Sequence, residues 1–198
     1  MKIILATHNP HKREELRSVL RSEFSDSIEV LTLEDIHPPI GDIEETGTTL
    51  EENALIKARA VHAQAKLPTI ADDTGLEVTA LGGAPGVFSA RYAGENATYA
   101  DNVHKLLDAL RGETNRSAKF STVIAYINKH GAEHLFRGEV EGTITDSPRG
   151  TNGFGYDPIF APTEDLSKRT FAEMSDAEKN AMSHRGRALR AFAQSLRS

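Results

Sequence analysis

The stretch Ala71-Asp72-Asp73-Thr74-Gly75-Leu76 is the starting point for interpreting this chain. It places two adjacent carboxylates where a short apolar strand is predicted to end and the chain to turn. Open α/β sheets commonly hold ligands at the carboxyl ends of their strands. Carboxylates there suit Mg²⁺, which binds one or two of them together with waters and phosphate oxygens. Asp-Thr-Gly is also good turn chemistry, so a simple turn remains the alternative.

The stretch Thr7-His8-Asn9-Pro10-His11-Lys12 is predicted to lead from a strand into a helix. Asn9 suits an N-cap, and proline suits the first helical position that follows it. The backbone N–H groups and the helix dipole at such a turn favour an anion, and Lys12 adds a point charge for phosphate. The spacing of a Walker A loop is missing. The alternative is a plain helix cap with a solvated lysine.

Glu44 and Glu45 precede a helix that is predicted to be capped by Thr48 or Thr49 and to run to about residue 65. Carboxylates in that place complement the helix dipole. The functional alternative is that one of them joins Asp73 around a metal. Lysines are seldom buried without a partner, yet Lys57 lies on the mostly apolar face of this helix. It either extends to solvent or points into a polar cleft.

The loop Gly153-Phe154-Gly155-Tyr156-Asp157 carries two aromatic residues next to glycines, which let a backbone approach a ligand closely. An aromatic side chain here can stack on a base, which contributes about 1–3 kcal/mol, or it can pack in the core. Lys179 and Ser183-His184-Arg185-Gly186 follow. Arginine can bind a base or a phosphate through two hydrogen bonds, or can simply be surface charge.

Composition limits the classes of function. The chain has 198 residues, a net charge of −6 and no cysteine. We expect one domain over residues 1–198, with two lobes and no separate domains. The acidic charge argues against a nucleic-acid partner, and the lack of cysteine excludes disulfides and thiolate metal sites. No apolar run approaches the roughly 20 residues that span a bilayer. We therefore expect a cytoplasmic protein with no membrane partner.

Apolar strand-like and amphipathic helix-like segments alternate along the chain. Strands are predicted over residues 2–6, 28–33, 69–71, 76–81, 119–127 and 134–145. Further helices are predicted over residues 14–20, 98–110 and 188–196, and after Ser175. Residues 128–131 form a short predicted hairpin turn, which makes two strands antiparallel. The sheet is therefore expected to be mixed.

These features together predict a Mg²⁺-dependent nucleotide hydrolase. A metal on phosphate oxygens can activate a water, a nearby carboxylate can accept its proton, and cationic side chains can stabilise the leaving phosphate. A serine hydrolase receives no support, because no G-x-S-x-G motif is present.

The sequence also resembles the non-standard purine nucleoside triphosphate pyrophosphatases, the inosine/xanthosine triphosphate pyrophosphatase (Ham1-like) family. The stretches discussed above carry the resemblance, together with Glu52-Asn53-Ala54, Gly82-Gly83-Ala84-Pro85-Gly86 and Ser89-Ala90-Arg91-Tyr92. They occur in the family's order over nearly the whole chain. Many members have serine where Thr74 stands, and threonine keeps the hydroxyl.

The resemblance implies an elongated α/β fold, with a mixed central β-sheet flanked by helices and two lobes around a deep active-site cleft, and a homodimer. It implies a small-molecule substrate. ITP, dITP and XTP would be hydrolysed with Mg²⁺ to the monophosphate and pyrophosphate, which removes damaged purines from the nucleotide pool.

The resemblance also implies roles for individual residues. Asp73 would be metal ligand and general base, Glu45 the second carboxylate, preferred over Glu44 without being settled, and Asp72 a supporting metal ligand. The triphosphate would be held by Thr7, His8, Asn9, Pro10, His11, Lys12 and Lys57. Thr74 would contact substrate, Phe154 would stack on the base, and Gly155, Tyr156 and Asp157 would line its pocket. Lys179, His184 and Arg185 would read a 6-keto purine, whose O6 and N7 are acceptors.

Two rival hypotheses belong to other classes. One is a nucleotide sensor without catalysis, against which the intact carboxylate pair argues. The other is a nucleotide-binding regulator of septum-type processes on a related fold. The aromatic loop and Ser183-His184-Arg185-Gly186 fit base selection better than that role.

Overall fold

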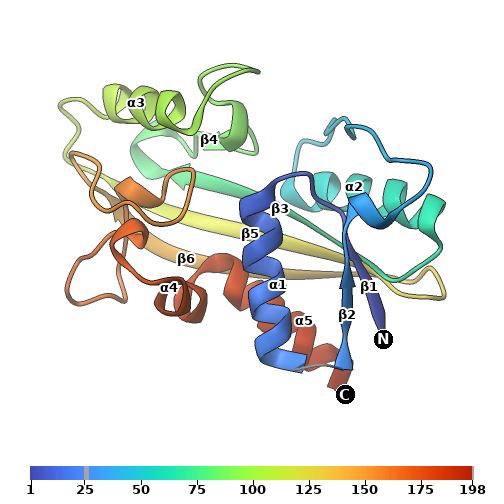
Figure 1. The fold of residues 1–198 in the computed structure, drawn as a ribbon. Helices are drawn as coiled ribbons and strands as arrows, with labels where there is room; N and C mark the ends of the chain where they lie inside the picture. The colour runs from blue at the N-terminus through green and yellow to red at the C-terminus, as the bar shows by residue number, and fades with distance from the viewer. Residues whose placement is uncertain (25–26, 198) are drawn as a thin grey trace. The chain divides into compact units, whose positions relative to one another are not determined.

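The computed structural model describes residues 1–24 and 27–197; Ser25, Asp26 and Ser198 of the predicted domain lie outside the described residues. The helices in those ranges are α1 (Pro10–Phe24), α2 (Leu50–Ala65), α3 (Tyr99–Ala109), α4 (Asp176–Met182) and α5 (His184–Arg197). The strands are β1 (Lys2–Leu5), β2 (Glu29–Leu31), β3 (Thr69–Val78), β4 (Pro85–Gly86), β5 (Ser117–Ile127), β6 (Glu133–Ile144) and β7 (Phe160–Pro162). Figure 1 shows these elements along the chain.

The strands form one sheet in the order β2-β1-β3-β5-β6-β7, and β4 pairs with β3. β1 is parallel to both of its neighbours, with Ile3 opposite Val30 and Leu5 opposite Ile70. β3 and β4 are antiparallel, as are β6 and β7. The expected α/β class with a mixed sheet and flanking helices is confirmed.

The chain divides into two compact units. Unit one comprises Met1–Asp73, Thr122–Gly138 and Arg185–Ser198, and unit two comprises Thr74–Ser121 and Glu139–His184. The strands β3, β5 and β6 contribute residues to both units. The boundary between unit one and unit two lies between Asp73 and Thr74, inside the stretch 71–76 that carries the two aspartates. That the two units form one domain stays a prediction.

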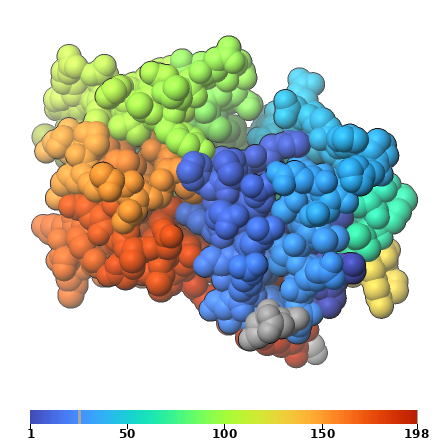
Figure 2. Space-filling model, in the orientation of Figure 1, coloured from blue at the N-terminus to red at the C-terminus, as the bar shows by residue number. Residues whose placement is uncertain are grey.

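The core of unit one lies between β1 and the helices α1 and α5. Buried Leu16 and Leu20 of α1 pack with Leu189 and Phe192 of α5 and with two residues of β1, Ile3 and Leu5. In Figure 1 α5 lies partly behind α1, and the shared cluster of buried side chains places the two helices against one another. In Figure 2 the surface of α1 adjoins the lighter blue segment after β2, where the Nη1 of Arg13 lies 2.8 Å from the Oε1 of Glu34. The amphipathic faces predicted for these helices thus close the core.

The core of unit two is aromatic. The rings of Phe120 and Phe160 lie 4.6 Å apart between centroids, and those of Phe160 and Phe171 lie 5.3 Å apart. Buried Val103, Leu106 and Leu110, on or next to α3, belong to the same cluster. These contacts anchor the segment that follows the aromatic loop.

The predicted turn after Asp72 and Asp73 is wrong, because β3 continues from Thr69 to Val78. The separate strand predicted over residues 76–81 is also wrong. Leu76 to Val78 complete β3, and a 3₁₀ turn occupies Thr79–Leu81. Turn-forming residues stay extended here because Leu76 and Glu77 pair with β4. Such tertiary pairing overrides local preference. The two aspartates therefore lie within a strand, where successive side chains point to opposite faces.

Candidate active site

The turn before α1 is built by its own side chains. The Oδ1 of Asn9 accepts hydrogen bonds from the backbone N–H groups of His11, at 3.0 Å, and Lys12, at 3.3 Å. The Oγ1 of Thr7 accepts one from the N–H of Asn9 at 3.1 Å. The cap predicted at Asn9 is confirmed, and α1 begins at Pro10. These hydrogen bonds fix the position of the Lys12 backbone and therefore the point from which its side chain extends.

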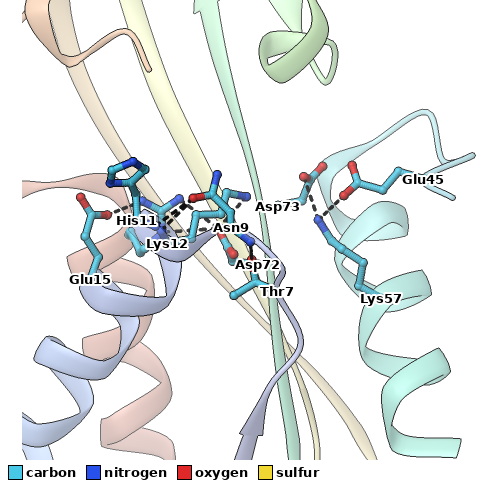
Figure 3. Close-up of polar contacts among 10 residues, drawn as sticks. Thr7, Asn9, His11, Lys12, Glu15, Glu45, Lys57, Asp72 and Asp73 are labelled. Carbon is cyan, nitrogen blue, oxygen red and sulfur yellow. Dashed lines mark hydrogen bonds and ion pairs between the residues drawn. The ribbon is translucent and has the colours of Figure 1, made fainter. Parts of the chain in front are cut away.

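Asp72 lies in a buried group of charges that we call the Asp72 cluster: Lys12, Glu15, Asp72 and Arg185. The Oδ2 of Asp72 lies 3.1 Å from the Nζ of Lys12 and 3.0 Å from the Nη2 of Arg185. The Nη1 of Arg185 lies 2.5 Å from the Oε2 of Glu15. The side chains of Asp72 and Arg185 are 0% and 3% exposed. Figure 3 shows Lys12, Glu15 and Asp72 of this cluster around the turn before α1.

The opposite charges of the Asp72 cluster stabilise one another's ionised forms. Burial alone raises the pKa of Asp72, but Lys12 and Arg185 outweigh it and hold that pKa well below its usual range. Burial lowers the pKa of Arg185, and Asp72 and Glu15 reverse this to a raised pKa. The pKa of Lys12 is lowered by burial, only partly offset by Asp72. Asp72 is therefore ionised and its charge is balanced within the protein.

Asp73 belongs to a different group, the Asp73 cluster of Glu45, Lys57 and Asp73. The Nζ of Lys57 donates to the Oε1 of Glu45 at 2.6 Å and to the Oδ1 of Asp73 at 3.2 Å. Figure 3 shows Lys57 reaching both carboxylates from α2. Of the two candidate glutamates, Glu45 makes this contact, whereas Glu44 is exposed.

Burial raises the pKa of Asp73 more than Lys57 and Lys12 lower it. Burial lowers the pKa of Lys57, but Asp73, Asp72 and Glu45 outweigh it and raise that pKa. The Oδ2 of Asp73 is buried and has no hydrogen-bond partner among the described residues. A carboxylate with a raised pKa and one uncommitted oxygen is suited to accept a proton or to ligate a cation.

The three carboxylates expected at a metal do not form one group. Among residues 1–24 and 27–197, no set of three or more His, Asp or Glu side chains is arranged to hold a metal ion. Glu45 and Asp73 share Lys57, whereas Asp72 contacts Lys12 and Arg185. The uncommitted Oδ2 of Asp73 and the partly exposed Glu45 offer hard oxygens that fit a divalent cation. The metal-ligand role of Asp72 stays a prediction.

Two residues that the sequence analysis did not select position these clusters. Glu15, one turn after Lys12 on α1, binds Arg185. Buried Asn53 accepts a hydrogen bond at its Oδ1 from the N–H of Gly47 at 2.8 Å and so holds the segment that carries Glu45. Two features of the sequence could have indicated these roles. Glu15 lies three positions after Lys12, on the same side of α1, and Asn53 is an amide on the apolar face of α2.

The aromatic loop in unit two is organised by Asp157. Its Oδ2 accepts hydrogen bonds from the N–H of Phe154 at 2.7 Å and from the Nζ of Lys179 at 2.6 Å. The same Nζ lies 4.9 Å from the centre of the Phe154 ring. Gly153 has φ +72°, and a Cβ there would lie 2.2 Å from the Oδ2 of Asp157. The loop therefore requires glycine at this position.

The remaining predicted residues have varied surroundings. The buried Tyr156 hydroxyl donates to the carbonyl oxygen of Ser89 at 2.9 Å, and burial raises its pKa. The ring of His184 is buried and stacks on Phe120 at 4.5 Å between centroids. Thr74 is half-buried. Arg185, the neighbour of His184 in the chain, turns to Asp72.

Each unit thus gathers its own set of the predicted residues. Unit one holds Thr7, His8, Asn9, Pro10, His11, Lys12, Glu45, Lys57, Asp72, Asp73 and Arg185, and unit two holds Thr74, Phe154, Gly155, Tyr156, Asp157, Lys179 and His184. The first set has the chemistry of phosphate and metal binding, and the second that of stacking and polar recognition of a ring.

Comparison with known proteins gives consistent matches over the full chain. A dITP/XTP pyrophosphatase from Thermoanaerobacter pseudethanolicus is 51% identical over 191 residues, covering 96% of this chain and 93% of the relative. One from Christiangramia forsetii is 48% identical and covers 99% of both chains. The solved structure of a HAM1 protein from Coxiella burnetii superposes with a TM-score of 0.87 at 46% identity, covering 99% of this chain and 98% of that one. Since the Ham1 family model also matches residues 3–195, this chain belongs to the Ham1 family.

Proposed function

We propose that this protein hydrolyses inosine- and xanthosine-type purine nucleoside triphosphates (ITP, dITP and XTP) to the monophosphate and pyrophosphate, and so removes damaged purines from the nucleotide pool. The relatives named dITP/XTP pyrophosphatase support the reaction. The observation that carries the proposal is the buried Asp73 carboxylate, which keeps one oxygen uncommitted beside Glu45 and Lys57.

In the proposed reaction a water attacks the α-phosphorus, and the bond from that phosphorus to the bridging oxygen of the pyrophosphate breaks. The Oδ2 of Asp73 accepts the proton of the water, a role that its raised pKa favours. The positive end of the α1 dipole, with Lys12 and Lys57, attracts the phosphates and stabilises the charge that develops on pyrophosphate.

We propose Mg²⁺ as the metal, held by Asp73 and Glu45. When bound, it supplies charge neutralisation on the phosphates and lowers the pKa of a ligated water. Both residues offer carboxylate oxygens, the ligand type that Mg²⁺ prefers. Asp72, with its charge already balanced by Lys12 and Arg185, supports them indirectly by holding Lys12.

Base selection is assigned to unit two. Phe154 stacks on the purine, and Lys179, held by Asp157, donates to the acceptors of a 6-keto base. Adenine presents a donor at the same position, and an unpaired buried polar group costs about 1–3 kcal/mol. His184 and Arg185 are packed against Phe120 and Asp72, so we assign them to shaping the site rather than to direct base contact.

Three further proposals follow the family resemblance: a homodimer, a cytoplasmic location and one two-lobed domain. Within residues 1–24 and 27–197, no helix is both long and apolar enough to cross a membrane. Light scattering coupled to gel filtration measures the oligomeric state directly. A mass equal to one chain would reject the homodimer.

The decisive test of the activity is release of phosphate after addition of an inorganic pyrophosphatase, across dITP, XTP, ITP and the four standard dNTPs. We expect Mg²⁺-dependent turnover of dITP and XTP and far poorer turnover of dATP. Equal turnover of all nucleotides would reject base selection, and binding of dITP without any turnover would support the sensor hypothesis instead.

A further inference from the structure

The ammonium of Lys57 lies between the two carboxylates of the Asp73 cluster. Its Nζ is 2.6 Å from Glu45 and 3.2 Å from Asp73, and no more than 27% of any of the three side chains is exposed (Figure 3). These are the same two carboxylates that we assign to the divalent cation. The ammonium of Lys57 therefore already binds the carboxylates that would attract a divalent cation.

Two like charges cannot share this position at low cost. Two like charges a few ångströms apart repel one another strongly where water is partly excluded, and a divalent ion doubles the repulsion. Glu45 and Asp73 contribute two negative charges, and Lys57 cancels one of them. A divalent cation gains its full attraction only when the ammonium has another partner.

We propose that Lys57 is a built-in counter-ion that competes with the divalent cation for Glu45 and Asp73 and leaves when a polyphosphate supplies new acceptors. The protein then binds the divalent cation weakly by itself and well together with the nucleotide. The four-carbon stem of lysine allows the ammonium to move without a change in the helix. The inference rests on the proposed function for the identity of the ligands, but the competition requires no turnover.

The test is a titration of the nucleotide-free protein with Mn²⁺, in which electron paramagnetic resonance measures the free ion. The variants are Lys57→Met, which removes the competing charge, and Lys2→Met, a control that removes an equal charge from an exposed pair with Glu29. We expect Lys57→Met to bind Mn²⁺ about tenfold more tightly than the wild type or better, and Lys2→Met to change the Kd by less than about threefold. Equal or weaker binding by Lys57→Met, or an equal gain in Lys2→Met, overturns the inference.

A double variant identifies the carboxylates. Adding Glu45→Gln to Lys57→Met should abolish the gain in Mn²⁺ affinity, and a gain that persists would place the ion elsewhere and overturn the inference. If turnover of dITP is absent while Lys57→Met still tightens Mn²⁺ binding, the proposed function fails and the competition stands.

A second measurement uses the wild type and does not depend on the folding of a variant. With ¹³C-labelled lysine, titration of the nucleotide-free protein with Mg²⁺ should shift the NMR signal of the Lys57 side-chain carbon next to Nζ as the ion binds. The corresponding Lys12 signal should shift less. A Lys57 signal that stays unchanged when the site is saturated overturns the inference.

Discussion

Asp72 and Asp73 are consecutive residues of β3, but their carboxylates contact different cations. Asp72 lies 3.0 Å from Arg185, whereas Asp73 lies 3.2 Å from Lys57. Side chains alternate between the faces of a strand, so adjacent aspartates reach different surroundings. Two cations, Lys12 and Arg185, neutralise the first, whereas the second shares the single ammonium of Lys57 with Glu45. We therefore expect substitutions at the two positions to have different consequences.

Asp73→Asn should abolish most of the turnover while nucleotide binding remains measurable, because the amide cannot accept the proton of the water. General-base catalysis contributes about 10²–10⁴-fold to a rate, so kcat for dITP should fall by at least that lower bound. Single-turnover assays and calorimetry separate kcat from binding. Asp108→Asn, at an exposed residue that pairs with Arg111, is the control and should be fully active. Near-normal turnover in Asp73→Asn would exclude this residue as the base.

Asp72→Asn should mainly lower stability, because it removes the carboxylate that buried Lys12 and Arg185 share and leaves only Arg185 with another partner, Glu15. Removing one partner of a buried ion pair costs about 3–5 kcal/mol in the free energy of unfolding. Urea denaturation measures this loss in the free energy of unfolding. The control Glu133→Gln breaks the largely exposed contact with Arg59 and should cost no more than about 1 kcal/mol. Similar losses in both variants would contradict the buried role of Asp72.

The stability contribution of Asp72 should depend on pH with a definite sign. Lys12 and Arg185 hold the pKa of Asp72 below its usual 3.8 in spite of burial, so the unfolded chain binds the proton more readily. The contribution is therefore fully present above pH 3.8 and is lost as pH falls below that value. The difference in free energy of unfolding between wild type and Asp72→Asn should be constant from pH 7 to about 5 and shrink below about 4. A difference that grows on acidification would reverse the sign and reject the assignment.

Gly153→Ala should disrupt the aromatic loop, since the added Cβ would lie 2.2 Å from the Oδ2 of Asp157, with φ at +72°. The control Gly155→Ala has a similar φ of +63° but meets nothing within 4 Å, so only backbone strain of about 1–2 kcal/mol applies. We expect Gly153→Ala to raise KM for dITP at least several-fold more than Gly155→Ala does. Steady-state kinetics on both variants checks the difference. Equal effects would show that the hydrogen bond from Phe154 to Asp157 does not organise the loop.

Phe154→Ala should raise KM for dITP by about 5- to 150-fold, which corresponds to the 1–3 kcal/mol of a stacking contact. Phe154→Trp keeps an aromatic face and should restore most of the binding. Inhibition by the monophosphate product measures the same contact without turnover. If Phe154→Leu binds as well as the tryptophan variant, the contact is only hydrophobic and the stacking role fails.

The sequence by itself determined the features that depend on neighbouring residues. Thr49, one of the two threonines predicted to cap α2, does so, because a cap needs only its own side chain and the next turn of backbone. Thr98 and Ser175 cap α3 and α4 in the same way. The same holds for Asn9 before α1. Motif order along the chain also indicated the Ham1 family, since it is a property of the linear sequence.

Only the tertiary structure decided how the charges are shared. Arg185 reaches Asp72 across 113 residues and Glu15 across 170, and no local pattern encodes such partners. The predicted turn at Asp73 failed for a similar reason, because β3 continues through Asp72 and Asp73 to Leu76 and Glu77, which pair with β4. Residue type identifies which groups can perform the chemistry. Burial and long-range packing decide which carboxylate faces two cations and which one shares a single cation with a second carboxylate.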